Sequence, residues 1–242
     1  MIFFQKKVGE TPLQMLDRLR VEQPEFLNSK LSYAGRLDPM AEGEMIVLVD
    51  EENKEYKKYL GYDKKYQATF LLGIKTDTGD ILGFITEFNK NIVGEKSKKD
   101  FLEGIEKQIL NFVEIKKQKY PWFSSMVVDG LKLFDHFKKG NLNIGRPSRE
   151  VTIKKVEKIK FDKISKIDLE EYVLNNISKI KGDFRQKETL EKWESFLKTS
   201  PDDFITVDFE ITVSTGTYIR ALTENIGYPV LLLKLHRKKI IV

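Results

Sequence analysis

Residues 31–43 (Leu-Ser-Tyr-Ala-Gly-Arg-Leu-Asp-Pro-Met-Ala-Glu-Gly) hold a carboxylate in a setting suited to chemistry. Asp38 is followed by Pro39, glycines stand on both sides at positions 35 and 43, and an apolar run comes next. Proline fixes its own φ and favours an extended residue before it, while glycine permits backbone angles that other residues avoid. The stretch therefore predicts a stiff loop that presents the Asp38 carboxylate to a ligand. The same residue types are also typical of a plain turn ahead of a strand.

Three further stretches are of chemical interest. Residues 64–73 alternate between polar and apolar and predict a strand, with Tyr66 on its apolar face. The polar loop at 76–80 lacks the spacing and the lysine of a phosphate-binding P-loop. Residues 215–222 turn into a predicted helix that carries Arg220. On residue type alone, Tyr66 fits a core aromatic and Arg220 fits an exposed helix position.

Composition narrows the partners and the chemistry. Lysine and arginine outnumber aspartate and glutamate by 42 to 37, giving a net charge of +5, which favours an anionic partner such as nucleic acid. A lysine-rich solvated surface is the alternative. Cysteine is absent, and His136 and His236 are the only imidazoles, so we expect no disulfide, no thiolate chemistry and no metal site. No signal peptide or long apolar run is visible, so we expect a cytoplasmic protein that does not enter a membrane.

The order of elements predicts an α+β fold in a single domain, residues 1–242. Thr11 is the expected N-cap of a helix that continues to about Arg20. Residues 204–214 alternate strongly and predict a strand, and weaker patterns predict strands over 81–88 and 111–118. Between about 162 and 200 the apolar spacing predicts two amphipathic helices inserted between neighbouring strands.

Three separated motifs, taken in order, resemble the TruB family of tRNA pseudouridine synthases. Residues 35–43 are similar to the catalytic-aspartate loop of pseudouridine synthases, and residues 65–80 to the tyrosine-bearing strand and loop of TruB. Residues 213–222 are similar to the last motif of that family, which carries its arginine. The resemblance covers about residues 6–237, apart from the 162–200 insert. It implies the pseudouridine synthase fold: a mixed, mainly antiparallel sheet flanked by helices, with the active-site cleft across the sheet.

The resemblance implies isomerisation of a uridine in the T-loop of tRNA, at tRNA position 55, to pseudouridine without a metal or an organic cofactor. Uracil must leave the ribose and rejoin it through carbon, which requires a group that captures C1′ or removes a proton beside it. A carboxylate suits either role, and the family mechanism offers both routes for Asp38. A base inside a folded T-loop also has to be flipped out before it can react.

The resemblance gives roles to further residues. Arg220 is expected to pair with Asp38 and hold it ionised and aimed. Tyr66 is expected to stack on the uracil, keep the site dry and offer its hydroxyl for proton transfer. The residues expected to bind RNA are aromatic, hydroxyl-bearing or basic: Tyr33, Arg36, Lys64, Lys65, Arg149, Thr217, Tyr218 and Arg237. Each basic residue, taken singly, is also typical of a solvated surface.

Several positions depart from the family pattern. Tyr33 stands where the bacterial family usually has a histidine that enters the T-loop, although an aromatic ring can still stack there. Arg36 makes its motif closer to the RluA and RsuA branches, whereas residues 65–80 favour TruB. Val127 replaces a lysine, which predicts weaker binding or slower reaction. Because the chain ends soon after Arg237, we expect no C-terminal PUA-type RNA-binding domain.

Two other functions stay open at this point. One is a pseudouridine synthase for another RNA, which Tyr33 and Arg36 leave possible. The other is a non-catalytic tRNA-binding protein or folding chaperone on the same scaffold. A pure binder has no need for Asp38, Tyr66 and Arg220 together, so the enzyme is favoured. We expect a monomer that binds the T-arm of tRNA, with no obligate protein partner.

Overall fold

The computed structural model describes residues 1–92 and 99–242 of the chain. Within this described part, seven strands form one sheet in the order β1-β3-β13-β4-β12-β11, and β2 pairs with β3 outside that path. Neighbouring strands are antiparallel except for β3 and β13, which are parallel. The strands of the sheet are β1 Ile2–Lys6, β2 Leu31–Ala34, β3 Ala41–Val49, β4 Asp63–Leu72, β11 Ile153–Ser165, β12 Asp203–Val213 and β13 Val230–Ile241. The predicted α+β fold with a mixed, mainly antiparallel sheet is confirmed.

The remaining elements are short pairs of strands and the helices that cover the sheet. The paired strands are β5 Ile74–Thr76 with β6 Ile85–Phe88, β7 Lys117–Lys119 with β10 Ser148–Glu150, and β8 Val127–Val128 with β9 Leu131–Lys132. The α-helices are α1 Pro12–Glu22, α2 Tyr56–Leu60, α3 Lys99–Leu110, α4 Leu133–Lys138, α5 Lys166–Ser178 and α6 Gln186–Thr199. Short 3-10 helices occur at η1 Pro24–Phe26, η2 Asp50–Glu55, η3 Asn111–Glu114 and η4 Arg220–Asn225. No helix of the described residues has the length and apolar character that crossing a membrane requires.

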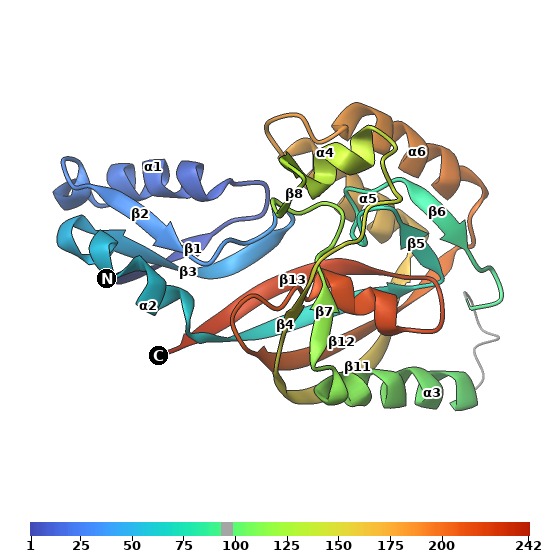
Figure 1. Ribbon diagram of the computed structural model, residues 1–242. Helices are drawn as coiled ribbons and strands as arrows, with labels where there is room; N and C mark the ends of the chain where they lie inside the picture. The colour runs from blue at the N-terminus through green and yellow to red at the C-terminus, as the bar shows by residue number, and fades with distance from the viewer. Residues whose placement is uncertain (93–98) are drawn as a thin grey trace.

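Helices cover both faces of the sheet, because alternate side chains of a strand point to opposite faces. On β4, Ala68 and Phe70 lie in one apolar cluster with the buried faces of α1 and α3. Leu71 lies in a second cluster with the buried faces of α5 and α6. Figure 1 shows β1, β2, β3 and α1 on one side of the molecule and β11, β12 and α3 on the other, with both termini on the first side.

Helix α1 begins as its sequence predicts. The Thr11 hydroxyl accepts a hydrogen bond from Gln14 N at 3.2 Å, and the Gln14 side chain accepts one from Thr11 N at 2.8 Å. This reciprocal capping box satisfies two of the amide groups that a helix start leaves unpaired. Met15, Leu16 and Leu19 are the buried side chains of the helix, so their spacing fixes which face packs on the sheet.

The two helices predicted between 162 and 200 are present as α5 and α6. Ser165 caps α5 by accepting from Asp168 N at 3.1 Å. On α6, Trp193 is fully buried and its indole N–H donates to Ile81 O at 3.0 Å. Losing a buried side chain of this size costs about 3–5 kcal/mol. The helical pair is therefore an integral layer of the fold and is not a loosely attached hairpin.

Some predicted elements are wrong or incomplete. The strand predicted over 111–118 is the 3-10 helix η3 followed by the short β7, because Phe112 turns back into the core straight after α3. The strand predicted over 81–88 is reduced to β6. Arg220 lies on the 3-10 helix η4, in a connection where a longer helix was expected. The C-terminal residues, for which no element was predicted, form the long strand β13.

Candidate active site

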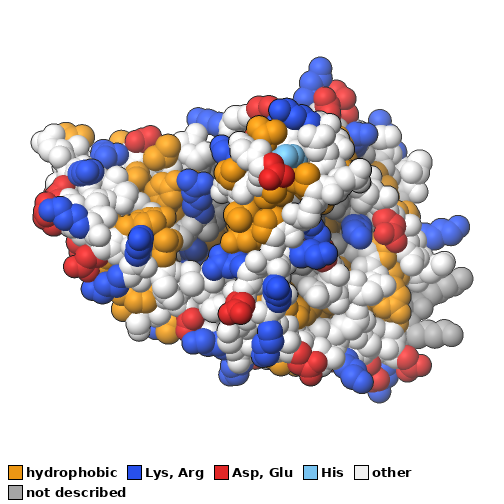
Figure 2. Space-filling model, in the orientation of Figure 1, with side chains coloured by type: hydrophobic (Ala, Val, Ile, Leu, Met, Phe, Trp, Pro, Cys, Tyr) orange, Lys and Arg blue, Asp and Glu red, His pale blue; other side chains and the backbone are white. Residues whose placement is uncertain are grey.

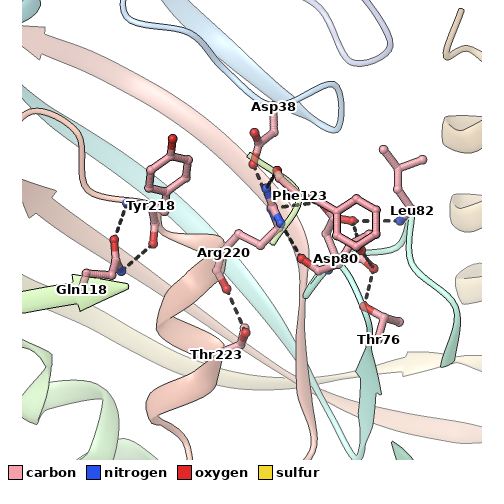
Figure 3. Close-up of polar contacts among 10 residues, drawn as sticks. Asp38, Thr76, Asp80, Leu82, Gln118, Phe123, Tyr218, Arg220 and Thr223 are labelled. Atoms are coloured by element: carbon pink, nitrogen blue, oxygen red, sulfur yellow. Dashed lines mark hydrogen bonds and ion pairs between the residues drawn. The ribbon is translucent and has the colours of Figure 1, made fainter. Parts of the chain in front are cut away.

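Three charged side chains from distant parts of the chain meet at one point. Arg220 Nε lies 2.9 Å from Asp38 Oδ2 and 3.3 Å from Asp80 Oδ2. Figure 3 shows the guanidinium between the two carboxyl groups. The Arg220 and Asp80 side chains are only 4% and 6% exposed, whereas the Asp38 side chain is 33% exposed. Asp38 is thus the member of the group that a ligand can reach. The predicted pairing of Asp38 with Arg220 is present.

Two buried basic residues, Lys6 and Arg237, fix the backbone around Asp38 by donating hydrogen bonds to its carbonyl groups. The Lys6 ammonium is buried and donates to Ala41 O at 2.6 Å and to Pro39 O at 3.4 Å. The Arg237 guanidinium is buried as well and donates to Gly35 O at 3.0 Å and to Glu44 O at 2.6 Å. Burial lowers the pKa of Lys6 to about 8, although nearby carboxylates oppose this. The loop backbone is fixed at both ends, so Asp38 is presented in one orientation.

Gly43 is required for the loop to reach β13. Its φ is +116°, and a Cβ atom there would lie 2.3 Å from the backbone oxygen of Arg237. The two residues are register partners in the parallel pairing of β3 with β13. Glycine alone lets the two backbones approach this closely.

Each of the three nitrogens of the Arg220 guanidinium donates a hydrogen bond. It donates through Nη1 to Thr78 O and through Nη2 to Phe123 O at 3.1 Å. Burial by itself would lower the pKa of Arg220, but the carboxylates of Asp38 and Asp80 outweigh burial and raise it above its ordinary value. A permanently charged arginine that is bonded through all three nitrogens keeps a fixed positive centre beside Asp38.

Asp80 is a site residue that the sequence reasoning missed, although it ends the 76–80 loop that was singled out. Its Oδ1 accepts from the Thr78 hydroxyl at 2.7 Å and from Leu82 N at 3.0 Å. Burial raises the pKa of the Asp80 carboxyl, while the Arg220 guanidinium opposes this. Asp80 therefore acts as a second, buried counter-charge for Arg220. The available signal was a carboxylate in a turn that follows a buried strand.

A cavity of about 270 Å³ opens at this group. Its walls include Asp38, Asp80, Arg220, Phe123, Phe134 and Arg185. Figure 2 shows apolar side chains gathered in the middle of this face with lysine and arginine side chains beside them. The cavity thus joins apolar and aromatic walls to the reachable carboxylate of Asp38 and the buried positive charge of Arg220, with Lys138 and the exposed Asp183 also on its lining. Such a site suits a flat, polar ring that reacts beside a carboxylate. The described residues contain no group of three His, Cys, Asp or Glu side chains arranged to hold a metal ion.

The model of the N-terminal domain of TruB family pseudouridylate synthases matches residues 24–182. This chain belongs to the TruB family. It is 31% identical over 229 residues to tRNA pseudouridine synthase B of Psychrobacter cryohalolentis, which covers 93% of this chain and 50% of the relative. The enzyme of the same name from Endomicrobium trichonymphae is 35% identical over 200 residues, which covers 82% of this chain and 65% of the relative. The chain spans about half to two thirds of the length of these curated relatives.

Solved structures support the fold of this TruB family member. A crystal structure of a Cbf5–Nop10–Gar1 complex contains a chain that matches with a TM-score of 0.52 and 16% identity. That match covers 98% of this chain and 48% of the other. The archaeal box H/ACA sRNP Nop10–Cbf5 complex matches with a TM-score of 0.50 and 14% identity, covering 99% and 47%. At such low identity these matches show the fold alone.

The predicted aromatic residue Tyr66 is buried on β4. It is 6% exposed and belongs to the same apolar cluster as Leu37 and Ile219, the residues directly before Asp38 and Arg220. Tyr66 is not among the residues that line the cavity, so its stacking on uracil stays a prediction.

Five of the predicted RNA-binding residues lie on exposed or half-buried loops and edges: Tyr33, Arg36, Arg149, Thr217 and Tyr218. Arg36 is exposed and makes no hydrogen bond or ion pair with any described residue. Tyr218 is fixed through its backbone, which bonds both ways to the Gln118 side chain at 2.8 and 2.9 Å. Burial, followed by the Asp38 charge, raises the pKa of the Tyr218 hydroxyl.

Thr217 belongs to the turn that precedes η4, and Arg149, on β10, packs against that turn. The Arg149 guanidinium packs flat on Gly216, where a Cβ atom would lie 1.9 Å from Cζ. One Arg149 nitrogen, Nη2, donates weakly to Thr215 O at 3.4 Å, and Nε is buried without a partner among the described residues. The Thr217 hydroxyl donates to Ser214 O at 3.0 Å. Nη1 of Arg149 makes no hydrogen bond with the described residues and is the donor left for a phosphate, because Nε is buried, whereas the Thr217 hydroxyl hydrogen stabilises the turn.

Three predicted phosphate contacts need correction. Lys64 and Arg237 are buried and their donors serve backbone carbonyls, for Lys64 those of Leu60 and Tyr62, so the prediction is wrong for both. Burial, and then the Arg237 charge, lower the pKa of Lys64 to about 8. Lys65 lies on the opposite face of β4 from Tyr66, where it pairs with Glu157 at 2.9 Å and Glu210 at 2.7 Å. Charge alone does not distinguish a solvated lysine from one buried by the sheet.

Proposed function

We propose that this chain is a tRNA pseudouridine synthase that isomerises a T-loop uridine, at tRNA position 55, to pseudouridine. The observation that carries the proposal is the pair of Asp38 and Arg220 at the mouth of the cavity, with Asp38 Oδ2 held 2.9 Å from Arg220 Nε. Membership of the TruB family and the names of its relatives support the same activity. The enzyme would be an isomerase that needs neither a metal nor an organic cofactor.

The two oxygens of Asp38 would have different duties. Oδ2 is occupied by Arg220, and Oδ1 accepts no hydrogen bond from the described residues, so Oδ1 is free to face the ribose. From there Oδ1 can attack C1′ in the covalent route. In the glycal route it can remove a proton from the ribose carbon beside C1′. The N1–C1′ bond breaks, a C5–C1′ bond forms, and the C5 proton leaves to solvent or base. The fixed Arg220 charge holds the Asp38 carboxylate in place, with Arg220 Nε 2.9 Å from Asp38 Oδ2.

Recognition of tRNA would rest on groups around the cavity that the fold leaves available. Arg36 and Nη1 of Arg149, which make no hydrogen bond with the described residues, are the donors available for phosphate oxygens, and Tyr33 and Tyr218 offer rings for stacking. Tyr66 keeps the stacking role that family membership suggests, and the flipped uracil would have to reach it from the cavity. We further propose that residues 1–242 act as a single catalytic domain, as a monomer. A tRNA substrate supports a cytoplasmic location for this enzyme.

The direct test compares the wild type with Asp38→Asn on unmodified tRNA, mapping pseudouridine by position. A single T-loop pseudouridine from the wild type, absent with Asp38→Asn, is the expected result. Binding of tRNA should be nearly unchanged, because asparagine preserves the shape of the side chain. Asp17→Asn is the matched control, since that carboxylate is 77% exposed on α1 and pairs only weakly with Arg20 at 3.6 Å.

Other outcomes would contradict the proposal in different ways. If the wild type binds tRNA but forms no pseudouridine, the chain is a tRNA-binding protein and the catalytic assignment fails. If it modifies ribosomal RNA and leaves tRNA unmodified, the reaction stands but the substrate is wrong. Equal activity of Asp38→Asn and the wild type would remove Asp38 from the mechanism.

A further inference from the structure

The connection between α5 and α6 reaches the candidate active site through Arg185. Its Nη1 lies 2.9 Å from Asp77 Oδ2, and its Nη2 lies 3.2 Å from Asp77 Oδ1. Both side chains are largely buried, at 18% and 9% exposure. A two-pronged arginine–carboxylate contact of this kind fixes orientation as well as distance. It therefore ties the α5–α6 connection to the 76–80 loop.

Arg185 also lies over two aromatic rings. Its guanidinium carbon is 4.1 Å from the centre of the Phe84 ring and 4.8 Å from that of Phe123. Both distances fall within the range of an attractive cation–π contact. Phe84 N donates to Asp77 Oδ1 at 2.8 Å, so Phe84 and Asp77 form one unit. Phe123, in contrast, belongs to the separate segment between β7 and β8, so Arg185 joins two segments of chain.

Arg220 contacts the same two segments, the 76–80 loop and the segment between β7 and β8. Arg220 donates to the carbonyl of Thr78, the residue after Asp77, and to the carbonyl of Phe123. The backbone of Arg185 adopts a left-handed conformation, with φ 60° and ψ 27°. This conformation is uncommon for a residue other than glycine and is kept where the surroundings demand it. The demand here is a guanidinium that meets Asp77 and both rings at once.

We propose that Arg185 is a positioning residue for the reaction. The inference rests on the proposed function, whose site it completes. Arg185 holds the 76–80 loop and Phe123 at the separation that the two Nη groups of Arg220 require, and Arg220 in turn aims Asp38. Because its charge is matched by Asp77, Arg185 does not serve as a phosphate ligand. The α5–α6 layer is thereby part of the catalytic apparatus.

The test measures kcat and KM on tRNA for Arg185→Ala, Arg185→Lys, Asp77→Ala and the double alanine variant. We expect Arg185→Ala to lower kcat about 10- to 100-fold with KM within about twofold, because a displacement near 1 Å at a reacting centre costs up to about 100-fold. Arg185→Lys keeps the charge without the fork and should recover only part of the rate. The double variant should lose little more than the more impaired of the two single variants, since Arg185 and Asp77 act largely through their shared contact.

Arg18→Ala is the matched control. Arg18 also pairs with a carboxylate through two nitrogens, Glu10 at 2.6 and 3.1 Å, and lies 4.6 Å from the centre of the Phe4 ring. Its exposure of 20% is close to that of Arg185, but it contacts neither the 76–80 loop nor Phe123. Arg18→Ala should lower the melting temperature by a similar amount and leave kcat unchanged.

Hydrogen exchange separates failure of this inference from failure of the proposed function. If the wild type makes no pseudouridine, the proposed function fails, but Arg185→Ala should still speed exchange in peptides covering 76–80 and 120–124, and Arg18→Ala should not. A kcat for Arg185→Ala within about twofold of an active wild type would overturn the inference. Additive losses in the double variant, or unchanged exchange in both peptides, would overturn it equally.

Discussion

Arg220→Lys separates the two duties of the buried arginine, charge and geometry. The substitution keeps one positive charge near Asp38 and Asp80. A lysine ammonium is a compact group without the planar fork, so it cannot also reach the carbonyls of Thr78 and Phe123. Both carbonyls lose their charged donor, and the two segments that carry them lose a shared partner.

The structure sets the size of the effect. A hydrogen bond to a charged group contributes about 1.5–3 kcal/mol, so losing two costs about 3–6 kcal/mol as an upper range. The whole free energy of unfolding of a domain is about 5–15 kcal/mol, so the variant should still fold. At this chain length each kcal/mol lowers the melting temperature by about 2–4 °C, which predicts a fall of about 6 °C or more. We expect kcat to fall about 100-fold or more, because Asp38 loses its aim.

Asp38→Asn provides the contrast. Asp38 is one-third exposed and Arg220 keeps Asp80 as a partner, so the loss of stability should be about 1 kcal/mol or less. Activity should nevertheless vanish. Thermal melts and release of tritium from C5 of labelled uridine in tRNA measure both quantities on the same proteins. An Arg220→Lys variant that melts within about 2 °C of the wild type and keeps its kcat would refute the reasoning.

Two further predictions concern stability. Contacts with three lysines lower the pKa of Glu210 from 4.5 to about 2, so the stability it contributes is present at neutral pH and lost as the pH falls from about 4.5 through about 2. The difference in melting temperature between wild type and Glu210→Gln should shrink over that window, and a constant difference would exclude the ion pairs as its source. Gly43→Ala should be insoluble or strongly destabilised, because the new Cβ meets Arg237 O at 2.3 Å. Gly104→Ala in α3, where a Cβ meets nothing within 4 Å, should raise stability by up to about 1 kcal/mol, and equal effects of the two would contradict this account.

Local patterns predicted those elements whose formation depends on neighbouring residues. The cap at Thr11 and the alternation in β4 and β12 act over a few residues, and the structure contains all three as expected. The meeting of Asp38 with Arg220 was expected only through resemblance to a family. Nothing in their spacing of 182 residues indicates that they touch.

Burial of basic side chains could not be predicted, because the groups that receive them come from other strands. Lys6 and Arg237 were typical surface residues by type, yet each donates to carbonyls of the Asp38 loop. The role of Arg185 could not be predicted for the same reason, since its partner Asp77 lies 108 residues away in the sequence. The sequence contains the donor in each case, and only the fold supplies the acceptor.

Strand β13, which no pattern predicted, brings the parts of the site into register. Its alternation is broken by irregularities between Leu232 and Lys234 and between Arg237 and Lys239, so a period of two is not visible in the sequence. Leu235 pairs with Ala41, which fixes the start of β3 three residues after Asp38. Leu232 N donates to Gly79 O at 2.9 Å, which fixes the residue before Asp80.

The chain also enters β13 directly from the segment that holds Arg220, because only residues 226–229 separate η4 from Val230. The positions of Asp38, Asp80 and Arg220 therefore all depend on one part of β13, the six residues from Val230 to Leu235. A slip of one residue would turn the side chains of β13 to the opposite face and move Ala41 and Gly79 relative to each other. The separation between Asp38 and Asp80, and thus the place of Arg220 between them, is a property of the β13 register more than of either loop.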